Sequence, residues 1–244
     1  WVSPANSCRS AARGQLIDRV EENFDGLRFI LRKKQPASPN RELHWTALIP
    51  SEFHSPSGAR GAIHKDGTVS VSGPPVKDTY YLKAVLPAGK PVRAFRLEAL
   101  ADDGDPPRGP GRSPDGSFSI AEIQVRASRP VSQGSNAALR FLHGTGDASV
   151  PLDDTANLID GKSDTAWSIR KPGNTPPRNH EAVLYLALPN PASADGAQWQ
   201  HPSAKDRELI LPAPGTAVEI SIEFLNSLTL GKFRLSVTSD TTLP

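Results

Sequence analysis

Cysteine, methionine and aromatic residues are scarce in this 244-residue sequence, which has one cysteine, no methionine and 6% aromatic residues. The single cysteine, Cys8, excludes an internal disulfide, so its thiol either pairs with another chain or stays free. A chain of this length can bury a core of its own without disulfides. Because the chain begins at Trp1 and lacks methionine, we expect a processed product or a piece of a longer protein.

A dominant sign of charge is also absent. Lys and Arg number 28 and Asp and Glu number 26, which gives a formal net charge of +2 at pH 7. No basic stretch is interleaved with aromatic residues, so we predict no nucleic-acid partner. No apolar run approaches the roughly 18 residues that a membrane-spanning helix needs, so we predict no membrane span.

Catalytic motifs are missing as well. The six histidines are scattered without an HExxH pair for zinc, and no GxSxG motif or phosphate-binding glycine loop occurs. The clustered acids, Asp102, Asp103 and Asp105 or Asp153 and Asp154, fall in predicted turns. Glycosidases instead need paired carboxylates in a cleft. We therefore predict that the protein is not an enzyme.

Proline and glycine, by contrast, are plentiful, with 24 and 19 residues. They separate short stretches of apolar and β-branched residues, which predict strands at 44–49, 69–72, 79–86, 92–100, 119–127, 138–142, 165–170, 182–188, 217–225 and 233–238. Many short strands separated by turns are typical of a β-sandwich or jelly roll. The predicted fold class is therefore all-β.

The stretch Val92–Val125 contains two of these strands and the longest predicted loop. Residues 102–117 hold four prolines and four glycines, which exclude helix and ladder strand there. A loop of this length usually binds something or covers a sheet edge. In the strand that follows, strict alternation places Phe118, Ile120, Glu122 and Gln124 on one face.

The N-terminal region differs in pattern. Residues 14–34 carry apolar side chains at helical spacing, namely Leu16, Ile17, Val20, Phe24, Leu27 and Leu31. They predict an amphipathic helix that docks on the sandwich or on a partner, with a membrane-surface helix as the alternative. We thus expect a tail and helix over 1–40 and a sandwich over 41–244, or two related halves, 41–129 and 130–244.

The segment 158–167, LIDGKSDTAW, is the most specific local signal. A carboxylate, a threonine hydroxyl and carbonyls around the Asp160–Gly161 turn would supply the oxygen ligands that calcium prefers. This pattern resembles the "DG…T.W" segment of discoidin-like, galactose-binding-like sandwiches, and 119–125 resembles their "SEIEV" strand. The resemblance implies a structural calcium at Asp160, Thr165 and Glu122.

This resemblance has one departure and one alternative. In the family the glutamate strand lies at the C-terminal end, whereas Glu122 precedes Asp160; a circular permutation would reconcile the two orders. The alternative is that Asp160 and Gly161 form a simple β-turn, that Trp167 is a core residue and that Glu122 is exposed.

A wider resemblance covers residues 45–240. Trp45, the segments 66–68, 78–80, 95–100, 109–112, 116–118 and 159–161, Trp167 and 231–235 occur in the same order as in the sandwich of planctomycete-type cytochrome c-domain proteins. That resemblance implies an exported protein, periplasmic or extracellular. The CxxCH haem motif of those proteins is absent, so no haem is implied.

Two groups of residues are candidates for ligand binding. Trp199 and His201 lie in a polar loop, where an aromatic ring can serve as a sugar platform or pack over a sheet edge. Arg108 and Arg112 lie in the proline-rich loop, where guanidinium groups can hold an anion or bind the loop's own carbonyls. Tyr80, Tyr81 and Trp167 are expected to be buried.

These features together predict a non-catalytic binding module. Its partner is expected to be a glycan, with a structural calcium near Asp160. The alternative is a structural or protein-interaction domain of a larger exported assembly, which binds another protein chain and no small ligand. The sequence leaves open the ligand, the oligomeric state and the role of Cys8.

Overall fold

The computed structural model describes residues 21–24, 27–30, 43–102, 109–128, 136–147, 154–170, 176–187 and 212–240. The chain divides into two compact units, Trp1–Glu42 and Leu43–Pro244. In the first unit, β1 (Glu21–Phe24) pairs antiparallel with β2 (Leu27–Ile30).

This hairpin shows that the helix predicted over residues 14–34 is wrong. The two strands are separated by Asp25 and Gly26, a dipeptide that strongly favours two-residue hairpin turns. The sequence analysis followed the helical spacing of the apolar residues and did not weigh the turn preference of this dipeptide. The described residues contain no α-helix, only the short 3₁₀ helix η4 (Thr155–Ile159), so the expected helix-binding partner loses its basis.

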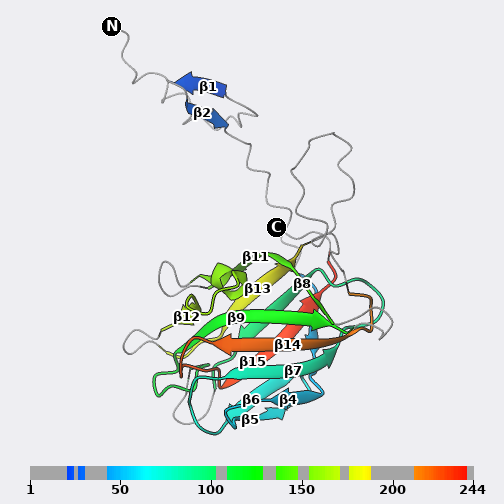
Figure 1. Ribbon diagram of the computed structural model, residues 1–244, viewed down its shortest axis with the longest axis vertical. Helices are drawn as coiled ribbons and strands as arrows, with labels where there is room; N and C mark the ends of the chain where they lie inside the picture. The colour runs from blue at the N-terminus through cyan, green and yellow to red at the C-terminus, as the bar shows by residue number, and fades with distance from the viewer. Residues whose placement is uncertain are drawn as a thin grey trace. The chain divides into compact units, whose positions relative to one another are not determined.

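The second unit consists of two antiparallel sheets (Figure 1). The front sheet has the order β10-β9-β14-β7-β4, with β12 also paired to β9; its strands are β4 (Glu52–His54), β7 (Thr79–Val85), β9 (Phe118–Ala127), β10 (Ala137–Ala138), β12 (Trp167–Ile169) and β14 (Ala217–Phe224). The back sheet has the order β11-β13-β8-β15-β6-β5, with β3 also paired to β15; its strands are β3 (Thr46–Leu48), β5 (Arg60–Ile63), β6 (Thr68–Ser72), β8 (Ala94–Ala99), β11 (Phe141–Gly146), β13 (His180–Leu186) and β15 (Lys232–Thr238). The predicted all-β sandwich is confirmed.

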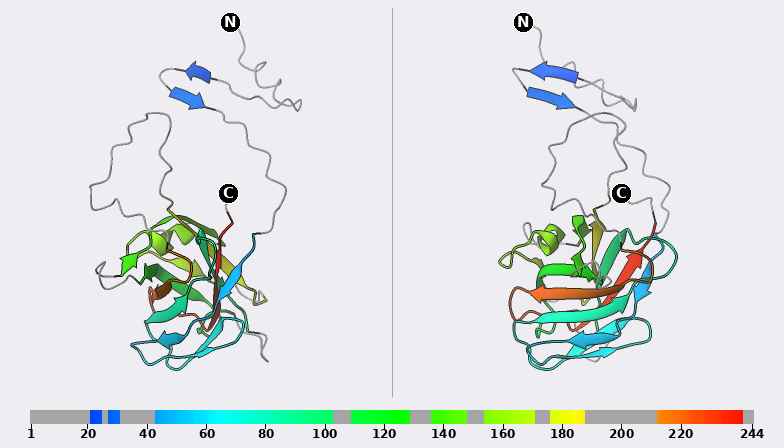
Figure 2. Two further views of the ribbon diagram at one scale, coloured as in Figure 1. Left: turned by 90° about the vertical axis from the view of Figure 1, so that its right-hand side faces the viewer. Right: turned by 45° about the vertical axis from the view of Figure 1, so that its right-hand side comes forward.

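The long strands alternate between the sheets along the chain, as in a jelly roll. β7, β9 and β14 belong to the front sheet, whereas β8, β13 and β15 belong to the back sheet. Strands from 41–129 and 130–244 are interleaved, because β14 lies between β9 and β7 and β8 lies between β13 and β15. The side views in Figure 2 show the resulting two layers. Both parts of the sequence therefore build one core.

Large aromatic side chains fill the space between the sheets. Tyr80, Phe118, Trp167, Phe224 and Phe233 are all fully buried. The rings of Tyr80 and Phe224 lie 4.6 Å apart edge to face, and those of Phe118 and Trp167 lie 5.0 Å apart in the same way. Burying one such ring stabilises the fold by roughly 2–3 kcal/mol. Trp167 is a core residue.

A β-bulge at Ala121 changes the facing of β9. Glu223 of β14 pairs with Glu122, but its neighbour Phe224 pairs with Ile120, so Ala121 is the extra residue. Ile120 and Ile123 consequently both enter the core. The prediction that Phe118, Ile120, Glu122 and Gln124 share a face is therefore wrong. The bulge turns Glu122 and Gln124 outward.

Candidate functional site: a groove on the outer face of the front sheet

The outward side chains of the front sheet form three rows across its strands. The acidic row contains Glu122, Glu223 and Thr79; the central row contains Gln124, Ser221, Tyr81 and His54; the ion-pair row contains Arg126, Glu219, Lys83 and Glu52. Each row follows the register of the antiparallel pairs, in which directly opposed residues lie close enough to interact. The alternation of side chains along each strand thus places acidic, neutral and oppositely charged side chains in three separate rows.

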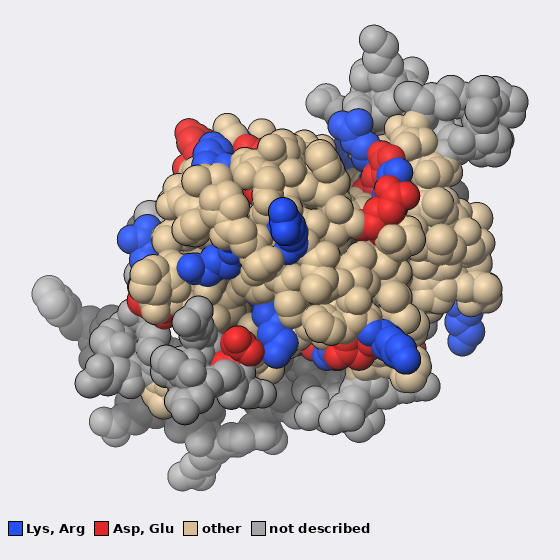
Figure 3. All heavy atoms as spheres, turned by 90° about the horizontal axis from the view of Figure 1, so that it is seen from below, with Lys and Arg blue, Asp and Glu red and all other residues tan. Residues whose placement is uncertain are grey.

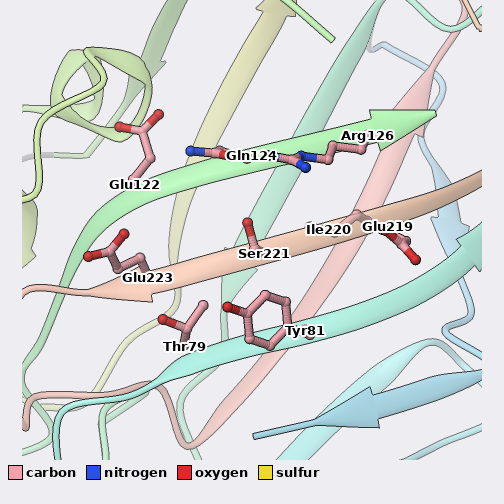
Figure 4. A pocket seen from close by; sticks show the side chains of 9 residues that line it. All are labelled: Thr79, Tyr81, Glu122, Gln124, Arg126, Glu219, Ile220, Ser221 and Glu223. Atoms are coloured by element: carbon pink, nitrogen blue, oxygen red, sulfur yellow. The ribbon is translucent and has the colours of Figure 1, made fainter. Parts of the chain in front are cut away.

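These rows line a groove of about 360 Å³. Its walls are Thr79 and Tyr81 from β7, Glu219, Ile220, Ser221 and Glu223 from β14, and Glu122, Gln124 and Arg126 from β9. Figure 4 shows Glu122 and Glu223 at one end, Tyr81, Ser221 and Gln124 in the middle, and Arg126 and Glu219 toward the other end. Its volume is at the lower end of the range of small-molecule sites.

The central row combines aromatic and hydrogen-bonding groups. Tyr81 is 46% exposed, although the sequence analysis predicted that it is buried. That prediction is wrong because successive residues of a strand face opposite sides, and Tyr80 takes the inward position. The Tyr81 and His54 rings lie 6.2 Å apart, inclined by 32°. An exposed ring beside the Gln124 amide and the Ser221 hydroxyl can bind a ligand with an apolar face and hydroxyl edges.

The ion-pair row is balanced within itself. Along it, Arg126, Glu219, Lys83 and Glu52 alternate in sign. The Lys83 ammonium lies 2.8 Å from the Glu52 carboxylate, whose hydrogen bond and charge raise the pKa of Lys83. Asn136 donates a hydrogen bond of 3.5 Å to Glu219. This end of the groove therefore carries no net charge.

The acidic row is not balanced. Glu122 lies directly opposite Glu223 and is only 9% exposed, so the alternative that it is an exposed residue does not hold. Its carboxylate accepts a hydrogen bond of 3.1 Å from the Gly161 amide. Burial first, then the charges of Asp160 and Glu223, raise the pKa of Glu122 to about 7 against that hydrogen bond. No described Lys or Arg forms an ion pair with either glutamate.

The turn at Asp160 contacts this end of the groove through the hydrogen bond from Gly161 to Glu122. Asp160 accepts hydrogen bonds from the Lys162 amide (2.9 Å) and the Thr165 hydroxyl (2.8 Å). Gly161 has a φ of 75°, which favours glycine. Strand β12, which follows the turn, pairs with β9. The structure thus brings Glu122 next to the turn that contains Asp160 and Thr165, although Glu122 precedes Gly161 by 39 residues in the sequence.

The oxygen-rich set at this turn matches the chemistry of a calcium site. Asp160, Thr165 and Glu122 offer two carboxylates and a hydroxyl, which are hard donors. All three side chains take part in hydrogen bonds within the turn, so an ion would exchange these bonds for metal bonds. The described residues hold no group of three or more His, Cys, Asp and Glu side chains suited to a metal. Backbone carbonyls would have to complete the site.

Of the other predicted ligand residues, the structure describes Arg112, which does not line the groove. Arg112 donates hydrogen bonds to the Gly73 carbonyl, to the Tyr80 hydroxyl (3.3 Å) and to Thr229 (3.5 Å), so its guanidinium binds the protein's own loops. Trp199, His201 and Arg108 lie outside the described residues. The sequence analysis missed the groove, whose signal was the alternation of polar residues in 79–85 and 217–224.

Charge on one further face of the molecule is mixed (Figure 3). In the view from below, Lys and Arg side chains are interspersed with Asp and Glu over the visible face (Figure 3). Within the part of the chain that the structure describes, no helix has the length and apolar character needed to cross a membrane.

Comparison of the chain with known protein families, with curated proteins and with solved structures finds no match.

Proposed function

We propose that the protein is a non-catalytic carbohydrate-binding module and that the groove on the front sheet holds the glycan. The observation that carries this proposal is the central row, where the half-exposed Tyr81 ring lies beside His54, Gln124 and Ser221. Sugars present apolar ring faces and hydroxyl edges, which an aromatic ring and neighbouring amide and hydroxyl groups complement. An exported setting, periplasmic or extracellular, rests on the sequence resemblance.

The first experiment tests the aromatic platform. Tyr81→Ala is expected to weaken glycan binding about tenfold or more, because the ring supplies both contact area and stacking. Val85→Ala is the matched control, since Val85 is also an exposed, outward residue of β7 but does not line the groove. The measurement is a glycan array followed by titration calorimetry on the best binder. Equal loss in both variants, or no loss in either, would refute the groove as the binding site.

The second part of the proposal is a structural calcium held by Asp160, Thr165 and Glu122. Bound calcium would stabilise the turn against β9 and supply positive charge beside Glu122. Calcium at a hundred times its Kd would raise stability by about 2.7 kcal/mol, and Asp160→Asn would abolish most of that gain. The check is the melting temperature in calcium and in chelator. An unchanged melting temperature for the unaltered protein would remove the metal from the proposal.

A protein-interaction domain is the second candidate function. It is favoured by β11, which has a strand partner on one side only in the described sheet and exposes 70% of Leu142. Unpaired strand edges are templates for pairing with another chain. This candidate would be favoured if the protein bound no glycan on the array and if it self-associated in a way that Leu142→Lys abolishes.

A further inference from the structure

The acidic row of the groove is an unusual feature for a sheet that serves only as structure. Glu122 and Glu223 are directly opposed on neighbouring strands. Like charges at such positions destabilise a sheet, and pairs of opposite charge are preferred. The ion-pair row of the same strands follows that preference, with Glu219 between Arg126 and Lys83. The acidic row departs from it four residues farther along β14.

Among the described residues, no Lys or Arg forms an ion pair with either of the two glutamates. Arg126 and Lys83 belong to the ion-pair row, where acidic residues oppose them. The Lys162 ammonium lies 4.0 Å from the Asp160 carboxylate, and its side chain is 64% exposed. Lys162 therefore pairs with the turn residue and is largely solvated. The groove therefore has one neutral end and one end with surplus negative charge.

The distance between the rows suits a single sugar unit. Adjacent rows are two residues apart along a strand, which corresponds to about 7 Å. A sugar ring stacked on Tyr81 would therefore place one edge near Glu223 and Thr79, while its other groups face Gln124 and Ser221. A substituent on that edge would meet the carboxylates of the acidic row.

We propose that the glycan recognised in this groove carries free amino groups, as in an oligomer of 2-amino-2-deoxy sugars, and that an ammonium group binds between Glu122 and Glu223. This inference rests on the proposed carbohydrate-binding function. It follows from charge complementarity: the ammonium supplies the positive charge that the acidic row lacks, and the neutral central row binds the ring that bears it. Glu122 would serve both the ammonium group and the proposed calcium, so the two cations would compete for its carboxylate, and the amine site is tested with calcium removed.

The test compares two oligosaccharides of equal length, one of glucosamine and one of N-acetylglucosamine, which differ in the charge of the amino group. In chelator at pH 7, we expect the unaltered protein to bind the glucosamine oligomer about tenfold more tightly, since hydrogen bonds to charged groups are the stronger ones. Calcium should reduce this preference, because it would occupy the Glu122 carboxylate. Circular-dichroism melting checks that each variant is folded.

Matched substitutions assign the preference to the acidic row. Glu223→Gln is expected to remove most of the preference for the glucosamine oligomer. Glu52→Gln changes the net charge equally but lies in the ion-pair row outside the groove lining, so it should keep the preference. A preference that Glu52→Gln reduces as much as Glu223→Gln does would reflect general electrostatics and would overturn the inference.

The outcomes separate the two levels of the proposal. Binding of both oligomers with equal affinity would overturn the amine site and leave the carbohydrate function standing. Binding of other glycans on the array, with neither amino sugar bound, would have the same meaning. Binding of no glycan at all would overturn both.

Discussion

The outer faces of the two sheets each carry a partly buried glutamate, and the two glutamates have opposite surroundings. On the back sheet, Glu98 accepts two hydrogen bonds from Arg234, of 2.8 and 2.9 Å, and lies 3.4 Å from Arg96. Burial raises the pKa of Glu98, but the hydrogen bond from Arg234 and the charges of Arg96 and Arg234 outweigh it and hold the pKa below its ordinary value. Glu122 on the front sheet has only a backbone amide as a described partner, and its pKa rises to about 7.

The difference separates a glutamate that is paired with cations from one that is not. Arg96 also lies over the Trp45 ring, 4.7 Å from its centroid, although its buried Nε has no hydrogen-bond partner among the described residues. On the front face, no described Lys or Arg forms an ion pair with Glu122 or Glu223. A carboxylate without a cationic partner in the described structure is a reasonable place to expect an external one.

The largest expected effect on stability comes from removing Glu98 from the outer face of the back sheet. Glu98→Ala would leave Arg234 and Arg96 without their shared partner, and we expect a loss of about 2–3 kcal/mol in the free energy of unfolding. Urea denaturation measures this loss. Lys83→Ala, which removes an exposed ion pair on the other sheet, should cost much less than Glu98→Ala. Equal losses of stability in the two variants would show that the ion pairs of Glu98 stabilise the fold no more than the exposed pair of Lys83 and Glu52 does.

Removing the charge of Glu122 should stabilise the ligand-free protein, whereas removing Glu98 should destabilise it. The pKa of its carboxyl is about 7 in the folded protein against an ordinary value of 4.5. Between these pH values the folded state keeps a proton that the unfolded state has lost, so the stabilising contribution is full below about pH 4.5 and is lost as the pH rises through 7. Glu122→Gln should therefore stabilise the ligand-free protein by about 1–3 kcal/mol at pH 8.

The pH profile of unfolding distinguishes this explanation from a general effect of the substitution. In chelator, the unaltered protein should lose stability between pH 5 and 8, and Glu122→Gln should show a shallower slope over the same range. Stability that rises with pH in this window, or parallel slopes for the two proteins, would show that Glu122 has an ordinary pKa.

The smallest effect concerns the more exposed partner of the acidic row. Glu223→Gln relieves the repulsion with Glu122 and should stabilise the ligand-free protein by about 0.5 kcal/mol. Glu219→Gln removes a residue that lies between two cations and should be neutral or slightly destabilising. Thermal melts at low salt compare the two variants. If Glu219→Gln stabilised the protein more than Glu223→Gln does, repulsion between Glu122 and Glu223 would not be what destabilises the acidic row.

The sequence predicted the interior of the sandwich better than its surface. The strands around Phe95, Ile220 and Leu235 were predicted within a few residues, because apolar alternation between proline and glycine turns is a strong signal. The short strands β4 and β5 were missed, since three or four residues without clear alternation carry little pattern. The N-terminal hairpin was mistaken for a helix because apolar spacing outweighed the Asp25–Gly26 signal.

The candidate site was only partly visible in the sequence. The meeting of Glu122 with the Asp160 turn was expected from the resemblance of two short motifs, and no periodicity could have joined residues so far apart. The outward facing of Glu122 depends on the bulge at Ala121, which is a three-dimensional property. Tyr81 was misjudged because an aromatic residue in a strand is more often inside than outside.

The bulge also determines which kinds of sequence change the groove can survive. Substitutions along β9 alter one side chain at a time. Deletion of Ala121 would remove the extra residue and make Ile120 and Glu122 neighbours, opposite Phe224 and Glu223, so strict alternation would keep Ile120 in the core and Glu122 in the groove. Insertion of one residue into the regular part of the strand, between Glu122 and Val125, would instead reverse the facing on one side of the insertion, so that core residues and groove residues would exchange sides there.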